Sequence, residues 1–356
     1  MTNPNTGKRR KVIAVCHSEP GAWHAPTPRY TTSRCPPADA ELAIGRTMFE
    51  TDRLPAGWPA RLSHMDYVWV PTDFARDVFA RGMRDEGHGD REVRVEVVAE
   101  PVDTAFFSPV PFDASLLRDT PLSPLAEFIQ RGATIFLFVG KWEERKGATL
   151  LLSAYMQEFS LDDNVLLLIL TSAYHSTPDW LERAAEQVHS PSPHAAPRLL
   201  LTALPQPLMP LLYSLPGAFL VLPSSGEGWG RPHVEAMSCA KPIVATNWSG
   251  PTAFLTTDNG YPIPVTALKA ASAWEGHRWA EVDEGALRAT MRRLWHDHTT
   301  DGGAAARQRG VQARSDMQRR FSLEVVGADV GGRLAAVVRG LDARQRPSMQ
   351  GRDQEL

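Results

Sequence analysis

A glycine-rich run between two apolar segments sets the first limit on the fold. The run SSGEGWGRPHVEAMSCAKPIVATNWSGP follows the apolar segment AFLVL at 218–222 and contains a second one, PIVAT, at 242–246. Gly226, Gly228 and Gly230 allow a sharp turn in which the backbone approaches a ligand closely. Pro232 suits the first turn of a helix beginning near Arg231, and the free amides of that helix would face an anion. The pattern predicts strand, turn, helix and strand in succession.

The same alternation extends over most of the chain. From Ile135 onward, β-rich runs such as IFLFV, VLLLIL and RLLLT alternate with segments of helical length, which indicates a parallel α/β sheet. These runs are continuously apolar, as burial on both faces of a doubly wound sheet requires. A weaker repeat of the pattern precedes them. Beyond Pro264 the sequence is interpreted as helical and charged.

The length of 356 residues favours two domains, because single hydrophobic cores usually stop growing before that size. The Pro-containing stretch 108–131 has no clear periodicity and is the expected boundary. We therefore predict an N-terminal Rossmann-like domain over 1–120, a C-terminal one with additional helices over 121–343, and a disordered tail over 344–356.

Composition excludes several classes of protein. Apolar residues make up 43% of the chain, and 38 Lys and Arg stand against 41 Asp and Glu, for a net charge of -3. No basic excess indicates a nucleic-acid partner, and the apolar run at the N-terminus is too short to span a membrane. The three cysteines have no metal-like spacing and are expected to be free thiols in a reducing compartment. The prediction is a cytoplasmic protein.

Two carboxylates flank the start of the expected helix. Glu227 and Glu235 are eight positions apart, so both can border one pocket at the carboxyl edge of the sheet. Carboxylates accept hydrogen bonds from vicinal hydroxyls, as on ribose or a hexose.

A second segment, VGKWEERKG at 139–147, also stands between a buried strand and a helix. Lys141 and Lys146 are predicted to contact a diphosphate. Two ammonium groups and a helix N-terminus would offset the charge on a departing nucleoside diphosphate, so that neither a metal nor a bound cofactor is expected.

Together the two segments resemble the donor site of retaining glycosyltransferases of the GT-B fold, family 4 (group 1). The resemblance implies two Rossmann-like domains facing a cleft. It assigns Glu227 to the donor sugar, Glu235 to the ribose hydroxyls, and the amides of Gly228, Trp229 and Gly230 to the sugar and phosphates. Lys141 and Lys146 would hold the diphosphate, with Lys141 standing where the family usually has Arg.

The resemblance weakens toward the N-terminus. Family members normally carry a further strand-helix-strand segment before the position of VIAVCHSEPGAW, so the first domain is expected to be incomplete and to lack its usual glycine loop. His17 matches a position where the family often places a His near the donor sugar, and we count it with Glu227 as catalytic. Glu50 and Asp52, in FETDRLP, could face the acceptor or be solvated loop charges.

The predicted function is metal-independent, retaining transfer of a sugar from a nucleoside-diphosphate sugar to a saccharide, lipid or protein. The alternative is a nucleotide-sugar-binding protein that has lost acceptor chemistry. A dinucleotide oxidoreductase is disfavoured, because no expected strand is followed by G-x-G-x-x-G with a downstream acidic residue. The sequence leaves the donor base and sugar open.

Overall fold

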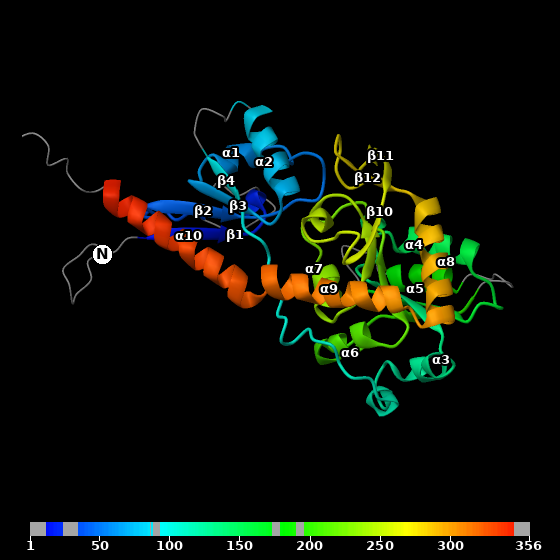
Figure 1. The fold of residues 1–356 in the computed structure, drawn as a ribbon. Helices are drawn as coiled ribbons and strands as arrows, with labels where there is room; N and C mark the ends of the chain where they lie inside the picture. Colours follow the sequence, from blue (N-terminus) through cyan, green and yellow to red (C-terminus); the bar gives the residue numbers. More distant parts are fainter. Residues whose placement is uncertain are drawn as a thin grey trace, which may run out of the picture.

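The computed structural model describes residues 12–23, 35–85, 87, 93–172, 179–189 and 196–344. Two parallel sheets lie side by side, the first from the N-terminal part of the chain and the second from its middle (Figure 1). The doubly wound α/β architecture predicted from the alternating pattern is confirmed. The predicted tail, 344–356, lies outside the described residues except for Arg344, which is the last residue of a helix.

The first sheet has the strand order β1-β2-β3-β4. Its strands are β1 (Ile13–His17), β2 (Leu42–Arg46), β3 (Tyr67–Val70) and β4 (Arg94–Val97), all parallel. Helices α1 (Trp58–Leu62) and α2 (Asp73–Asp85) pack on one face, where Leu62, Val68 and Phe79 are completely buried. The apolar side chains of α2 lie on one side of the helix, and this amphipathic pattern fixes which face meets the sheet.

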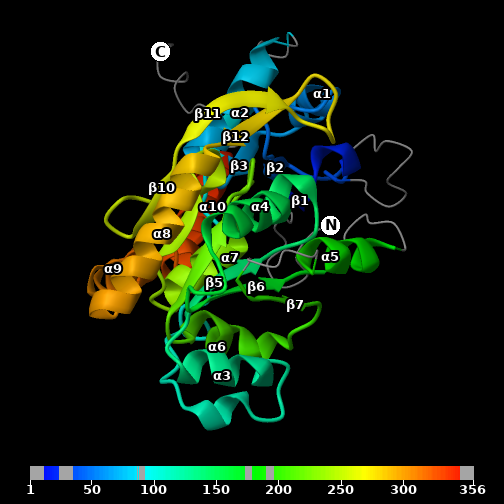
Figure 2. The same ribbon diagram turned by 90° about the vertical axis from the view of Figure 1, so that its right-hand side faces the viewer.

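The second sheet has the strand order β10-β9-β8-β5-β6-β7. Its strands are β5 (Thr134–Val139), β6 (Val165–Leu170), β7 (Arg198–Leu201), β8 (Ala218–Leu222), β9 (Ile243–Thr246) and β10 (Gly260–Ile263). In Figure 2, α4 and α5 lie on one side of this sheet and α3 and α6 on the other. After β5 the chain adds β6 and β7 on one side of that strand. It then returns to add β8, β9 and β10 on the other side, so the strand order reverses between β5 and β8. Ligands of such sheets bind at this carboxyl-end crevice.

The helices of this part of the chain are α3 (Ala126–Gln130), α4 (Ala148–Glu158), α5 (Trp180–Val188), α6 (Met209–Ser214), α7 (Arg231–Ser238), α8 (Glu284–Asp301), α9 (Ala304–Arg320) and α10 (Leu323–Arg344). Short 3-10 turns are η1 (Pro20–Ala22), η2 (Ala114–Leu117), η3 (Ser123–Leu125), η4 (Glu144–Lys146), η5 (Gln206–Leu208) and η6 (Gly250–Ala253).

The last helix crosses back to the first sheet (Figure 1). Val337 and Leu341 of α10 join a buried cluster with Leu42, Ile44 and Trp69. The segment that leads into α10 lies beside the segment that leaves the first sheet, and the Val102 amide donates to the Phe321 carbonyl at 2.8 Å between them. The first sheet is therefore covered by α1 and α2 on one side and by α10 on the other.

The interpretation of everything beyond Pro264 as helical is wrong for residues 265–282. Strands β11 (Val265–Ala270) and β12 (Arg278–Val282) form an antiparallel hairpin, and helix begins only at Glu284. The turn contains Gly276 at φ +74°, and Trp279 and Val282 are buried. Long-range packing of these residues outweighs a local composition in which many alanines weaken the β-strand signal.

The expectation of three free thiols is also wrong. Cys16 and Cys35 form a disulfide with their Cα atoms 5.7 Å apart, whereas Cys239 is free and buried. Cys16 lies near the end of β1, and the chain brings Cys35 back beside it before β2 begins. Spacing along the sequence does not reveal such proximity, and the argument from cysteines to a reducing compartment loses its basis.

Candidate functional site

The two motif segments meet at the strand-order reversal because each follows one of the adjacent strands β5 and β8. Gly147, at φ +77°, ends the turn η4. It lies so close to the segment after β8 that a Cβ at this position would collide with the Pro223 carbonyl. The Ser225 amide donates to the Arg145 carbonyl at 2.7 Å. A residue with a side chain at position 147 would separate the segments, so this glycine allows their docking.

Glu227 is the centre of the site. Its side chain is 8% exposed, and the Lys146 Nζ lies 2.8 Å from Oε1 and 2.7 Å from Oε2. The Glu227 amide donates to Ser249 Oγ at 2.9 Å, and this hydrogen bond fixes the backbone of Glu227. Burial alone would raise the pKa of Glu227, but Lys146 and Arg145 outweigh it and lower that pKa to about 2. The carboxylate is therefore ionised at neutral pH.

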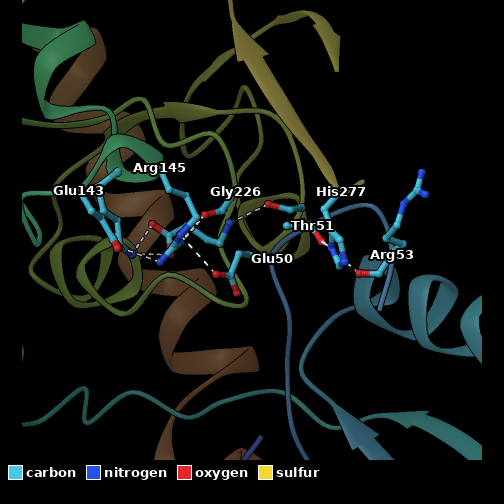
Figure 3. A network of polar contacts seen from close by, with 10 residues as sticks. Glu50, Thr51, Arg53, Glu143, Arg145, Gly226 and His277 are labelled. Carbon is cyan, nitrogen blue, oxygen red and sulfur yellow. Dashed lines mark hydrogen bonds and ion pairs between the residues drawn. The ribbon is translucent and has the colours of Figure 1, made fainter. Parts of the chain in front are cut away.

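Arg145 connects three parts of the molecule (Figure 3). Its Nη1 donates to the Gly226 carbonyl at 2.6 Å and lies 3.4 Å from Glu227 Oε2. Its Nη2 pairs with Glu143 at 2.9 Å, and its Nε lies 3.3 Å from Glu50 Oε1 of the first domain. Sequence reasoning missed Arg145, since within the charged run KWEERK nothing separates it from solvated neighbours.

The loop between β2 and α1 supplies Glu50 and closes over the glycine turn. A Cβ at Gly226 would collide with the Glu50 carbonyl, and one at Gly228 would lie 2.7 Å from Met48. Burial raises the pKa of Glu50, with partial opposition from Arg145. Glu50 therefore faces the site, whereas Asp52 accepts hydrogen bonds from the Arg278 amide at 2.7 Å and side chain at 3.1 Å.

The glycine turn presents backbone amides rather than side chains. No residue in the described part of the chain accepts a hydrogen bond from the amides of Gly228, Trp229 or Gly230. The Trp229 ring is buried in the core, with its centroid 5.2 Å from that of Phe254 and 5.3 Å from that of Phe321. The Trp229 side chain is thus not available to a ligand at this turn.

Glu235 lies on α7 in a separate set of contacts. The Tyr213 hydroxyl donates to its Oε2 at 3.1 Å, and Arg231 Nη2 lies 3.5 Å from its Oε1. Burial raises the pKa of Glu235, although both partners oppose the shift. Glu227 and Glu235 thus stand on the same turn and helix but are directed to different partners.

Lys141 is close enough to Lys146 and Arg145 to be affected by their charges, whereas His17 lies apart from the Glu227 contacts. Lys141, after β5, is partly buried, and this burial lowers the pKa of its ammonium group. His17 ends β1 beside Arg46 of β2 and is exposed to solvent. Within the residues that the structure describes, none forms a hydrogen bond or ion pair with the His17 side chain. The structure joins Lys146 to Glu227 and does not join His17 to either.

His233 was not singled out by the sequence. It is 1% exposed on α7, and its ring lies directly against Gly230. Neither ring nitrogen has a hydrogen-bond partner among the described residues. Burial lowers the pKa of His233 to about 4, against the opposing effect of Glu227. A neutral imidazole thus lies beneath the glycine turn.

Comparison with known proteins bears on the class of protein and on its fold. Residues 133–274 match the family model described as "Glycosyl transferases group 1", and the matched segment contains both motif loops. Comparison with curated protein sequences gives no significant match. The matched domain identifies the chain as a glycosyltransferase.

Solved structures define the fold more fully. Sucrose-phosphate synthase from Thermosynechococcus elongatus is 19% identical with a TM-score of 0.59, over 86% of this chain and 69% of that one. The α,α-trehalose 6-phosphate synthase from Burkholderia multivorans is 14% identical with a TM-score of 0.66, over 96% and 74%. Anabaena HepE in complex with UDP-glucose is 14% identical with a TM-score of 0.60, over 83% and 72%. The fold is GT-B.

Among the described helices, none has both the length and the apolar character needed to cross a membrane.

Proposed function

We propose that this chain transfers a sugar from a nucleoside-diphosphate sugar to an acceptor, with retention at the anomeric carbon and without a metal ion. The observation that carries the proposal is the buried Glu227 carboxylate, whose two oxygens both accept from Lys146 beside glycine-turn amides that have no partner among the described residues. Carboxylate and amides suit a sugar and its phosphate, and they meet where open α/β sheets bind ligands.

The charges of the site indicate how the leaving group would be stabilised. Lys146 and Lys141 would contact the diphosphate, and their positive charge would offset the negative charge that develops when the glycosidic bond breaks. Glu235 would bind the ribose hydroxyls. Arg145 is already engaged by three carboxylates, so its part would be to hold Glu227 and the glycine turn in place.

Retention is proposed through a same-face displacement assisted by the leaving phosphate. Double-displacement retaining enzymes need a nucleophile on the opposite face of the sugar, and Glu227 is held by Lys146 and Arg145 rather than free for that role. His17 is kept as a candidate contact to the donor sugar. The solved neighbours include a protein described in complex with UDP-glucose and trehalose-phosphate synthases described as UDP-forming, which favours a uracil nucleotide here. Cytoplasmic residence remains part of the proposal.

A second candidate is a nucleotide-sugar-binding protein without acceptor chemistry. The observation that favours it is the loop of the first domain, whose Met48 and Glu50 pack directly on Gly228 and Gly226. Turnover by the purified chain distinguishes the two candidates.

The test is calorimetric titration with UDP, GDP, ADP and NAD, repeated on Lys146→Ala and Glu235→Ala. Arg183→Ala and Glu186→Ala, at exposed positions on α5 outside the Glu227 contacts, serve as controls that remove a positive and a negative charge. We expect one nucleoside diphosphate to bind, and to bind about tenfold or more weakly to the first two variants. Absence of binding by any nucleoside diphosphate would overturn the proposal.

The stereochemistry and the metal independence have their own measurements. The anomeric proton coupling of the product, observed by NMR, should match that of the donor, and inversion would refute same-face displacement. Turnover should persist in excess EDTA, whereas its loss and recovery on adding a divalent cation would show that a metal is required.

A further inference from the structure

A cavity of about 670 Å³ lies between the first domain and the β11–β12 hairpin. One wall is the exposed face of α2, with Phe74, Asp77 and Arg81. Trp248, which follows β9, and Arg278 of β12 line it from the second domain. No function proposed above uses this cavity, which is large enough for a sugar of one or two rings.

The cavity adjoins the donor site through Trp248. The Phe74 and Trp248 ring centroids are 4.9 Å apart, in an edge-to-face arrangement. A Cβ at Gly226 would lie 3.0 Å from the Trp248 ring, and the next residue, Ser249, accepts the hydrogen bond from the Glu227 amide. A ligand against Trp248 would thus be separated from the glycine turn that carries Glu227 by the Trp248 side chain.

The lining of the cavity combines apolar side chains with ionisable ones whose charges balance. Its ionisable side chains are three carboxylates and three guanidinium groups: Asp52, Asp77, Asp85, Arg53, Arg81 and Arg278. A phosphate or other strong anion needs a local excess of positive charge, which this lining does not provide. Hydroxyl groups both donate and accept, so they satisfy carboxylates and guanidinium groups at once. Aromatic rings add a surface for the apolar face of a sugar ring.

We propose that this cavity binds a neutral saccharide as the acceptor, with Trp248 and Arg81 as contacts. The inference rests on the proposed function and names the acceptor class for the same site. The acceptor would enter between α2 and the hairpin, so that both domains contribute to its recognition.

The test measures saccharide binding without any donor. Fluorescently labelled protein is applied to an immobilised array of neutral and anionic oligosaccharides, and the strongest neutral ligand is then titrated by saturation-transfer NMR. We expect neutral glycans to bind, with affinity about tenfold weaker in Trp248→Ala and in Arg81→Ala. Arg84→Ala, exposed on the same helix but not lining the cavity, is the matched control and should bind as the wild type does.

Circular dichroism and a thermal unfolding midpoint close to those of the wild type show that Trp248→Ala and Arg81→Ala are folded. Trp248→Phe, which keeps an aromatic ring, should recover part of the saccharide affinity. The inference is overturned if only anionic glycans bind, if no glycan binds, or if binding is unaffected in both cavity variants. Failure of the proposed function would appear separately, as loss of nucleoside-diphosphate binding by the wild type.

Discussion

Glu227 is a buried carboxylate whose charge depends on two neighbouring cations. Its pKa is lowered from an ordinary 4.5 to about 2, so its ionised form contributes about 3 kcal/mol to stability at neutral pH. A lowered carboxyl pKa means that this contribution is complete above pH 4.5 and is lost as pH falls toward 2. Urea unfolding between pH 7 and pH 3 should therefore show a smaller acid loss in Glu227→Gln than in the wild type. Equal losses would contradict the pairing with Lys146.

His233 titrates in a different window. Its pKa is lowered from 6.5 to about 4 by burial, so its contribution is complete above pH 6.5 and is lost as pH falls to 4. We expect His233→Leu to be less sensitive than the wild type between pH 7 and pH 4.5, measured by thermal unfolding. His296→Leu, at an exposed position on α8, is the control and should behave as the wild type does. A wild-type imidazole that titrates near pH 6.5 in NMR would refute the burial argument.

The residues that sequence could identify are those whose context is local. Glu227 and Lys146 each follow a recognisable buried strand, and the structure brings them into direct contact. Arg145 and Glu50 could not be paired, because the partner of each is set by the docking of two domains rather than by spacing. Trp229 lies within the glycine turn, but only tertiary packing directs its ring into the core.

The β11–β12 hairpin is an element that ties the second sheet to the loop before α1. Thr51 Oγ1 and His277 Nδ1 are 2.7 Å apart and both side chains are buried, while the Phe49 and Trp274 rings are 5.2 Å apart. Figure 3 shows Thr51 and His277 facing one another, on the side of Glu50 away from Arg145. The hairpin thus holds the loop that carries Glu50.

Thr51→Val tests this tie while conserving the shape of the side chain. Leaving the buried His277 nitrogen without its partner should cost about 1–3 kcal/mol. Thr266→Val is the control, because its hydroxyl is exposed in the same hairpin. Thermal unfolding measures the cost, and hydrogen exchange should increase in residues 265–282. Equal stability of the two variants would show that the contact contributes nothing.

At the scale of the whole molecule, the sequence predicted sheets and motifs better than the path of the chain. Continuous apolar runs identify buried parallel strands, and five of the six strands of the second sheet lie in the quoted runs or beside the glycine turn. Helix α10 packs on the first sheet because that surface remains uncovered after all the strands have formed. The local sequence of α10 does not predict this packing.

Leu341→Ala tests the packing of α10 on the first sheet. Leu341 is 8% exposed in the cluster with Leu42 and Trp69, so its truncation should cost about 2 kcal/mol or more. Val338, on the same helix, is 39% exposed, and Val338→Ala should be nearly neutral. Urea unfolding measures both, and equal effects would show that the helix is not held by this face.

The return of α10 has a consequence for synthesis on the ribosome. Strands β1 to β4 are translated before residue 98, yet the helix that covers their second face begins only at Leu323. The second sheet has all its strands by residue 263 and can complete much of its core while the chain is still growing. The domain that is made first is therefore completed only after α10 has been made, and until then Ile44 and Trp69 lack the side chains that cover them.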